Sequence, residues 1–294
     1  MPSVPALLSR AIRTTAFVSP RAAGRLAYRT FFSTEPRMRV HARDAATHEA
    51  AHTGSLTLGS RSVTTYEWGA GPRTVLLLHG WRGRVSQFAP LVRELVSEGF
   101  RVVSFDAPAH GSSAGGPTDV RDWVEAATRL HGIHGPFDAL VGHSFGAFAA
   151  LTAARTTVPT PAVVAIAGAA GPIAFVDEFT RDFRLDERTA AHMNALFRAR
   201  LGVDEAELTA RYDAAQHPLP ESTALLVVHD RADRRMPDAD SLRLHAAHDG
   251  RSRLLRTEGF GHTRILQADA VLDAVIEHVQ GAGRRAGVQS GSAR

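Results

Sequence analysis

The sequence predicts an α/β fold built on a mostly parallel, doubly wound sheet, and three observations lead to that class. Short apolar runs alternate with amphipathic helical segments, which is typical of parallel strands joined by helices. The pentapeptide that begins at Gly142 joins one such run to a helix rich in small residues. The alternation breaks only over residues 171–220, where a short helical cap of about three helices is expected before the next strand.

The individual elements follow from their residue patterns. Residues 55–68 indicate a β-hairpin with its turn near Ser60, and residues 74–79 indicate a fully buried strand. Apolar residues on one face predict a helix over residues 84–98, which Gly99 ends. The other expected strands are 101–105, 137–142, 162–166, 224–228 and 253–256, and the other helices are 118–132 and 145–156.

Ser144 is the candidate nucleophile. It is the central residue of Gly142-His143-Ser144-Phe145-Gly146, between an apolar strand and a helix. A serine in a sharp strand-to-helix turn is held in a strained backbone conformation with its hydroxyl exposed, and the neighbours two positions away must lack side chains. The Phe145 N–H lies in the first helical turn, where backbone donors are unpaired and can hold an anion.

A nucleophilic serine needs a base and an acid that orients the base. Asp233 follows the predicted strand 224–228, and His262 follows the strand 253–256. Both positions are at the carboxyl ends of strands, where sites form in open α/β sheets. Asp230 is the alternative acid, but it lies within or beside the strand end, which favours Asp233.

The backbone N–H of Trp81 is the second candidate donor to an oxyanion. It follows the strand 74–79 in the run His79-Gly80-Trp81. The end of the third strand is where such a donor is expected when a serine elbow is present. Trp81 and Phe145 are therefore expected to form the oxyanion hole and also to contact the substrate.

These motifs together resemble the α/β-hydrolase family, over roughly residues 53–281. The matching segments are His79-Gly80-Trp81, Asp106 to Ser113, Gly142 to Gly146, His229 to Asp233 and Gly261-His262. The resemblance implies Ser144 as nucleophile, His262 as base and Asp233 as acid. It also implies a serine hydrolase that cleaves a carboxylic ester or thioester of a small-molecule acyl substrate through an acyl-enzyme.

Two other functions are compatible with this resemblance. The same three residues can serve C–C bond hydrolysis or cofactor-free perhydrolysis, and some members of the fold are non-catalytic binding modules. A serine at the elbow disfavours dehalogenase and epoxide-hydrolase chemistry, which in this family uses an aspartate there. No metal and no organic cofactor is expected.

The composition excludes several kinds of chemistry. The chain has no cysteine, which excludes a disulfide framework and a thiol nucleophile. All 34 basic residues are arginine, which excludes lysine chemistry. The formal net charge is only +4 and no basic stripe with interleaved aromatic residues is present, so nucleic acid is not an expected partner.

The two ends differ from the rest of the chain. The expected organisation is an arginine-rich leader with a helix at 1–52, a core at 53–170 and 221–281, a cap at 171–220 and a disordered tail at 282–294. The leader helix, near residues 20–32, is expected to rest Leu26, Phe31 and Phe32 on the body. Membrane-surface association and organelle targeting are alternatives for the leader. No integral membrane segment is expected, the predicted location is cytoplasmic, and the oligomeric state is open.

Overall fold

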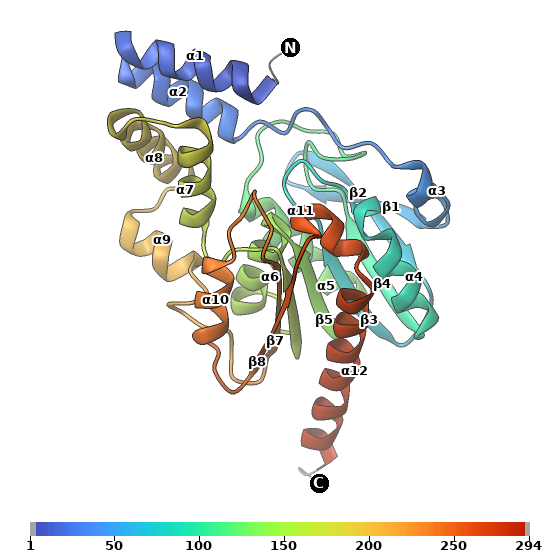
Figure 1. Ribbon diagram of the computed structural model, residues 1–294. Coiled ribbons are helices and arrows are strands. Elements are labelled where there is room, and N and C mark those ends of the chain that lie inside the picture. The colour runs from blue at the N-terminus through green and yellow to red at the C-terminus, as the bar shows by residue number, and fades with distance from the viewer. Residues whose placement is uncertain (1–3, 292–294) are drawn as a thin grey trace.

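An eight-stranded sheet forms the centre of the protein (Figure 1). The computed structural model describes the backbone of residues 4–291 and the side chains of residues 6–281. The strand order is β1-β2-β4-β3-β5-β6-β7-β8, in which β2 is antiparallel to β1 and to β4 and all other pairs are parallel. The strands are β1 His52–Leu58, β2 Arg61–Trp68, β3 Arg73–Leu78, β4 Phe100–Phe105, β5 Ala139–His143, β6 Ala162–Ile166, β7 Ala224–Asp230 and β8 Ser252–Thr257. The predicted α/β class with a mostly parallel sheet is confirmed.

Helices cover both faces of this sheet, which explains the continuous apolar runs in its central strands. In β3, Val75 and Leu77 belong to one buried cluster while Leu76 and Leu78 belong to another on the opposite face. One face carries η1 Val85–Phe88, α4 Ala89–Ser97, η2 Ile265–Gln267 and α12 Asp269–Gly291, and the other carries α5 Val120–His134, α6 Phe145–Thr156 and α10 Ala239–Ala246 (Figure 1).

Three helices fill the segment between β6 and β7, where the sequence shows no strand pattern. They are α7 Pro172–Phe183, α8 Glu187–Leu201 and α9 Glu205–Tyr212. Asp186 caps α8 and Asp204 caps α9, each accepting a hydrogen bond from a backbone N–H of the first turn. We call these three helices the helical insert. The predicted number of helices and their place before β7 agree with the structure.

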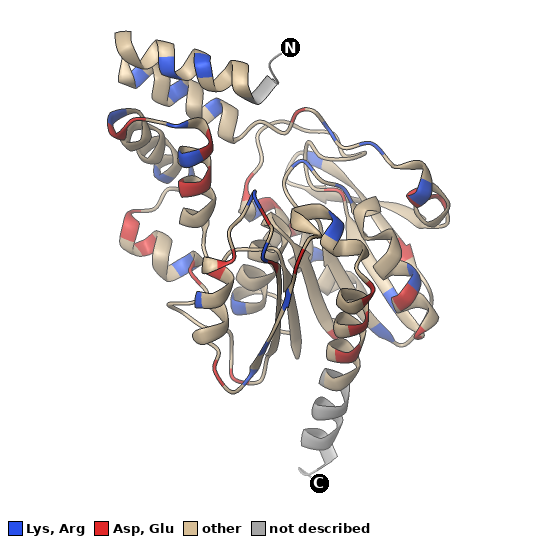
Figure 2. Cartoon of the chain, viewed as in Figure 1, with Lys and Arg blue, Asp and Glu red and all other residues tan. Residues whose placement is uncertain are grey.

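The N-terminal segment contains more helix than the sequence analysis expects. The expected helix is α2 Pro20–Phe31, but α1 Val4–Val18 and α3 Ala42–Glu49 accompany it. Helix α2 packs on α8: an ideal Cβ on Gly24 would lie 2.6 Å from His192 Cβ, so only glycine allows this approach. Arginines but no acidic residues are seen on α1 and α2 (Figure 2).

The aromatic end of α2 packs on the core, as expected for Leu26, Phe31 and Phe32, and also on the helical insert. The Phe31 ring lies 5.4 Å from Phe179 and 6.0 Å from Phe197, both in the insert. The Phe32 ring lies 6.3 Å from Trp81. Leu26 is partly buried in the same cluster. The sequence cannot show this arrangement because the insert that receives α2 lies about 150 residues further along the chain.

The C-terminal segment also differs from the expectation of a disordered tail after residue 281. Helix α12 continues to Gly291, although the stretch 281–291 is rich in glycine. Residues 292–294 lie outside the described residues.

Two glycines allow β5 and α6 to meet at a sharp turn. An ideal Cβ on Gly142 would lie 2.2 Å from the Gly146 carbonyl oxygen, and one on Gly146 would lie 2.0 Å from the Leu78 carbonyl oxygen. Contacts this short involve backbone on both sides, so they cannot be relieved by rotating a side chain. The motif predicts small residues at both positions. The structure gives the reason, since neither position has room for a side chain beside the neighbouring backbone.

We expect Gly146→Ala to destabilise the protein by at least about 2 kcal/mol, because the methyl group overlaps the backbone of β3. Gly132→Ala is the matched control, since Gly132 is an exposed glycine inside α5 with nothing within 4 Å of the added Cβ. That substitution should be neutral or stabilising by up to about 1 kcal/mol. Urea unfolding followed by circular dichroism measures both, and equal effects of the two substitutions would contradict the packing argument.

Candidate active site

Ser144 occupies the turn between β5 and α6. Its backbone has φ 55° and ψ −121°, a conformation that L-residues rarely adopt. The turn is held because the Ser144 N–H donates to the Ile166 carbonyl over 2.8 Å. The side chain is partly exposed, so its hydroxyl is accessible from the carboxyl edge of the sheet.

His262 lies between Ser144 and Asp233 and is hydrogen-bonded to both. Its Nε2 is 2.9 Å from Ser144 Oγ, and its Nδ1 is 2.7 Å from Asp233 Oδ2. An ionised carboxylate can only accept, so Nδ1 carries the proton and Nε2 is free to accept from the serine hydroxyl. The structure thus brings the three residues together in the order in which the sequence analysis arranges them.

Asp233 is buried in the loop after β7, and its surroundings keep it ionised. Burial would raise the pKa of this carboxyl, but hydrogen bonds from His229 and His262 outweigh burial and hold the pKa well below its ordinary value. Its second oxygen, Oδ1, accepts from the Arg235 N–H at 2.8 Å and the Met236 N–H at 3.1 Å. Both oxygens are therefore used, and the carboxylate cannot rotate away from His262.

Asp230, the alternative acid, has a different environment. Its Oδ2 accepts from Thr257 Oγ1 at 2.8 Å and from the Phe260 N–H at 3.0 Å, and its Oδ1 accepts from the Ala232 N–H. These bonds fasten the loop after β8, which carries His262, to the end of β7. The geometry thus favours Asp233 over Asp230 as the partner of the imidazole.

His143 connects the elbow to the loop of His262, a contact that the sequence analysis misses. Its Nε2–H donates to the His262 carbonyl oxygen at 2.7 Å, and its Nδ1 accepts from the Gln87 amide at 3.0 Å. Burial, together with the nearby His262 ring, lowers the pKa of His143 to about 3. A neutral imidazole makes both hydrogen bonds, which the protonated form cannot. Only the position of His143 in the elbow motif could have indicated this role, because Gln87 is distant in sequence.

The two expected oxyanion donors belong to backbone next to Ser144. An ideal Cβ on Gly80 would lie 3.0 Å from Ser144 Cβ, so the backbone that leads into Trp81 passes directly beside the serine. Phe145 is the first residue of α6, where a backbone N–H has no acceptor within the helix.

Aromatic rings surround this side of Ser144. The Trp81 ring lies 5.2 Å from the Phe145 ring and 5.8 Å from the Trp123 ring. Phe145 is also 5.7 Å from Phe175 of α7, which brings the helical insert to the edge of the site. The Trp81 Nε1–H is used in a 2.9 Å bond to the Ser33 carbonyl oxygen, so the indole presents an apolar surface.

Asp106 orders the loop after β4 and does not face Ser144. The carboxylate is fully buried and accepts from the Val85 and Ser112 N–H groups at 2.9 and 2.8 Å and from the Tyr66 hydroxyl at 2.9 Å. His110 in the same loop is buried, and burial, followed by the nearby His79, lowers its pKa to about 3. Neither Asp106 nor His110 is a predicted site residue, and their contacts are to the loop and to the neighbouring strands and helices.

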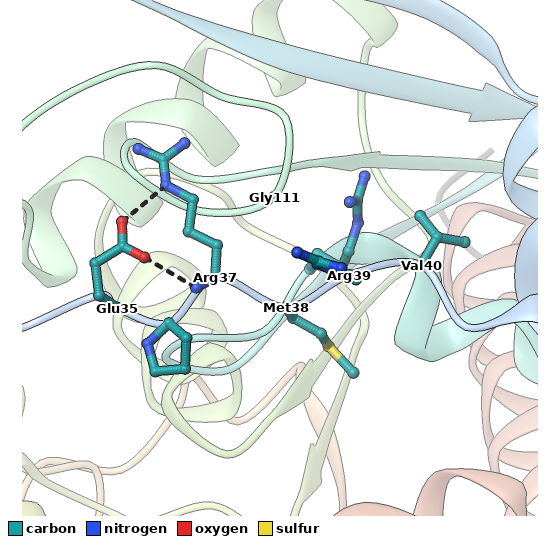
Figure 3. Close-up of a pocket in the computed structure, with 8 residues that line it drawn as sticks. Glu35, Arg37, Met38, Arg39, Val40 and Gly111 are labelled. Atoms are coloured by element: carbon teal, nitrogen blue, oxygen red, sulfur yellow. Dashed lines mark hydrogen bonds and ion pairs between the residues drawn. The ribbon is translucent and has the colours of Figure 1, made fainter. Parts of the chain in front are cut away.

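Two surface hollows differ in their relation to this arrangement. The first, of about 540 Å³, lies along residues 35–40 and is bordered by Arg84 and Gly111 (Figure 3). None of the expected site residues lines it. The second, of about 490 Å³, is lined by His262 itself and by residues of the loops after β7 and β8. The second hollow is therefore the one related to the candidate site.

The fold and this arrangement of residues define a hydrolase class: a mostly parallel sheet with a strained serine between β5 and α6. The sequence profile of the alpha/beta hydrolase family matches residues 75–289, which is more than half of the chain. The protein belongs to the alpha/beta hydrolase family. No curated protein sequence matches the chain significantly.

Solved structures support the same fold. An esterase from Pyrococcus furiosus superposes with a TM-score of 0.62 at 18% identity, covering 83% of this chain and 98% of the esterase. Mouse alpha/beta hydrolase domain-containing protein 10 gives 0.61 at 16% identity, covering 80% and 99%. The thioesterase domain from the curacin biosynthetic pathway gives 0.55 at 16% identity, covering 79% and 99%. Among the described residues, no helix is long and apolar enough to span a membrane.

The buried neutral histidines predict a loss of stability in mild acid. An unfolded histidine binds a proton below about pH 6.5, whereas His143 and His110 in the folded protein do so only near pH 3. Protons therefore bind preferentially to the unfolded chain as the pH falls, and stability falls with it. At pH 5 each of these two histidines should cost about 2 kcal/mol relative to pH 7.

Urea unfolding between pH 7 and pH 5 measures this loss, in a window above the range where carboxylates titrate. His143→Gln should reduce the pH dependence by the contribution of one histidine, whatever its effect on stability at pH 7. If the variant and the wild type lose stability equally over this window, His143 is not the neutral buried group that its hydrogen bonds require.

Proposed function

We propose that the protein is a serine hydrolase that cleaves a carboxylic ester or thioester through Ser144, His262 and Asp233. The observation that carries this proposal is the unbroken chain of hydrogen bonds from Ser144 Oγ through His262 to Asp233. A hydroxyl bonded to a base, with the base bonded to a buried carboxylate, is the arrangement that activates a serine nucleophile.

In the first step, His262 Nε2 takes the proton of Ser144 as the serine oxygen attacks the acyl carbon. The imidazolium that forms carries a positive charge, which the Asp233 carboxylate stabilises across 2.7 Å. Because both oxygens of Asp233 are held by hydrogen bonds, the imidazole keeps the tautomer and orientation that the transfer needs.

The Trp81 and Phe145 N–H groups hold the oxygen of the tetrahedral intermediate. Each such donor contributes on the order of 10² to 10³ in rate. His262 then donates its proton to the leaving alcohol or thiol, and an acyl group remains on Ser144. Water, activated by the same imidazole, hydrolyses this acyl-enzyme and restores the serine.

The aromatic rings of the site and the similar solved structures both support this class of substrate. The rings of Trp81 and Phe145 give the acyl group an apolar surface beside the nucleophile. The solved structures that share this fold include proteins named as an esterase and as a thioesterase domain. Ester and thioester hydrolysis both cleave the bond between an acyl group and an oxygen or sulfur atom.

We expect Ser144→Ala, His262→Ala and Asp233→Asn each to lower kcat/KM for p-nitrophenyl esters by about 10⁴ or more, since each removes one member of a unit that acts together. The measurement is nitrophenol release from the acetate, butyrate and octanoate esters. Labelling of Ser144 by an organophosphonate, lost in Ser144→Ala, provides an independent readout.

Asp230→Asn is the matched control for the acid. Asparagine keeps an acceptor oxygen for the Phe260 N–H but could not replace an ionised partner of the imidazole. It should retain activity within about tenfold of wild type, and the opposite ranking of the two aspartates would reassign the acid. Labelling without turnover of any ester or thioester would point to another bond type, and a folded protein that is not labelled would point to a binding module.

A further inference from the structure

The hollow beside His262 has a basic wall. Three of the residues that line it are Arg234 and Arg235, in the loop after β7, and Arg264, in α11 Gly261–Arg264. Figure 2 shows basic segments on this loop and on α11. In the described part of the chain, no acidic side chain is among the residues that line this hollow. The wall is thus positive without a built-in counter-charge.

Some arginines near this edge of the sheet are neutralised by an acidic partner. Arg256 pairs with Asp238 at 2.5 Å and Arg243 pairs with Asp213 at 3.0 Å. Within the described residues, Arg234 and Arg235 are exposed and neither they nor Arg264 form an ion pair at 4.0 Å or less. Guanidinium groups that have no acidic partner are suited to bind a carboxylate or phosphate.

The hydrogen bonds of Arg264 and the pKa of Arg82 agree with a positive charge at the hollow that no acidic side chain neutralises. Arg264 Nη2 donates to the Gly259 carbonyl at 2.9 Å, which positions the side chain without cancelling its charge. Arg82 is partly buried, and burial followed by the positive charge of Arg235 lowers its pKa, which the negative charge of Glu35 only partly opposes. A bound anion would relieve this repulsion.

The position of the hollow identifies the part of the substrate that would enter it. In the proposed reaction, His262 donates its proton to the leaving oxygen or sulfur, so the leaving group must lie against His262. His262 lines the basic hollow, whereas Ser144, Trp81 and Phe145 do not, so the hollow adjoins the site on the side of His262. The acyl half and the leaving half of the substrate therefore meet surfaces of opposite character.

We propose that the leaving alcohol or thiol carries a carboxylate or phosphate, which Arg234 and Arg235 bind with support from Arg264. This inference rests on the proposed function and specifies its substrate class as an ester or thioester with an anionic leaving group. The reaction itself is unchanged: the acyl–oxygen or acyl–sulfur bond breaks, water supplies the hydroxyl of the acid product, and the anion leaves with the alcohol or thiol.

The test uses three acetate esters that share an acyl group and a phenolic leaving group: neutral 4-acetoxybenzamide, anionic 4-acetoxybenzoate and 4-acetoxyphenyl phosphate. The double variant Arg234→Gln/Arg235→Gln should lose at least about fivefold in kcat/KM for the anionic esters relative to its change on the neutral ester. Comparing variant with wild type on each ester cancels the different reactivities of the phenols. Added salt should reduce the difference.

Arg231→Gln is the control, because Arg231 is exposed in the same loop but does not line the hollow. It should leave the ratio of anionic to neutral turnover unchanged. A larger effect on 4-acetoxyphenyl phosphate than on 4-acetoxybenzoate would identify phosphate as the preferred anion, and the reverse would identify carboxylate.

The outcomes separate this inference from the function on which it depends. If the neutral ester is hydrolysed in a Ser144-dependent way but the double variant affects all three esters equally, the anion site is refuted and the hydrolase proposal stands. An equal response to Arg231→Gln would also refute it, since net charge alone would explain the effect. If wild type hydrolyses none of the esters, the proposed function fails and this inference fails with it.

Discussion

The backbone strain at Ser144 is the constraint on which the rest of the site depends. A positive φ at a serine costs free energy, and it persists only because β3, β5 and α6 are packed so closely that no relaxed path is available. The same packing places the Gly80 backbone beside Ser144 Cβ and starts α6 at Phe145. The strained torsion is therefore tied to the close approach of β3 and α6, which the packed faces of the sheet maintain.

His262 and Asp233 follow the ends of β8 and β7, and hydrogen bonds to other segments hold both of these connections in place. Two aspartates three residues apart divide this work: Asp230 fastens the end of β7 to the loop after β8, while Asp233 faces the imidazole. His143 fastens that second loop to the elbow through the His262 carbonyl. Each connection is therefore fixed by hydrogen bonds to a strand end. These bonds keep the His262 and Asp233 side chains within hydrogen-bond distance of each other.

The sequence predicts those parts of the protein that depend on local pattern. The apolar strands, α6 and the serine elbow follow from periodicity and from glycine spacing, and the order of Ser144, Asp233 and His262 follows from the strands that precede them. What the sequence does not reveal depends on contacts between distant segments. The Gln87–His143 bond and the docking of Phe31 on Phe179 join residues more than 50 positions apart. Helix α1 also escapes prediction, since the composition of the leader, with seven arginines and one acid in its first forty residues, equally suits an unfolded segment.

The distribution of charge around Ser144 is the last consequence of this architecture. The histidines beneath the site, His79, His110 and His143, are buried with lowered pKa values, so they add no positive charge on the aromatic side at neutral pH. Asp233 carries the negative charge that balances His262 when the imidazole is protonated. The arginines of the hollow are then the cations that an approaching substrate meets beside His262. In the proposed reaction, a substrate with an apolar acyl group and an anionic leaving group would be oriented by both halves, because the aromatic rings favour the acyl group and the arginines favour the anion.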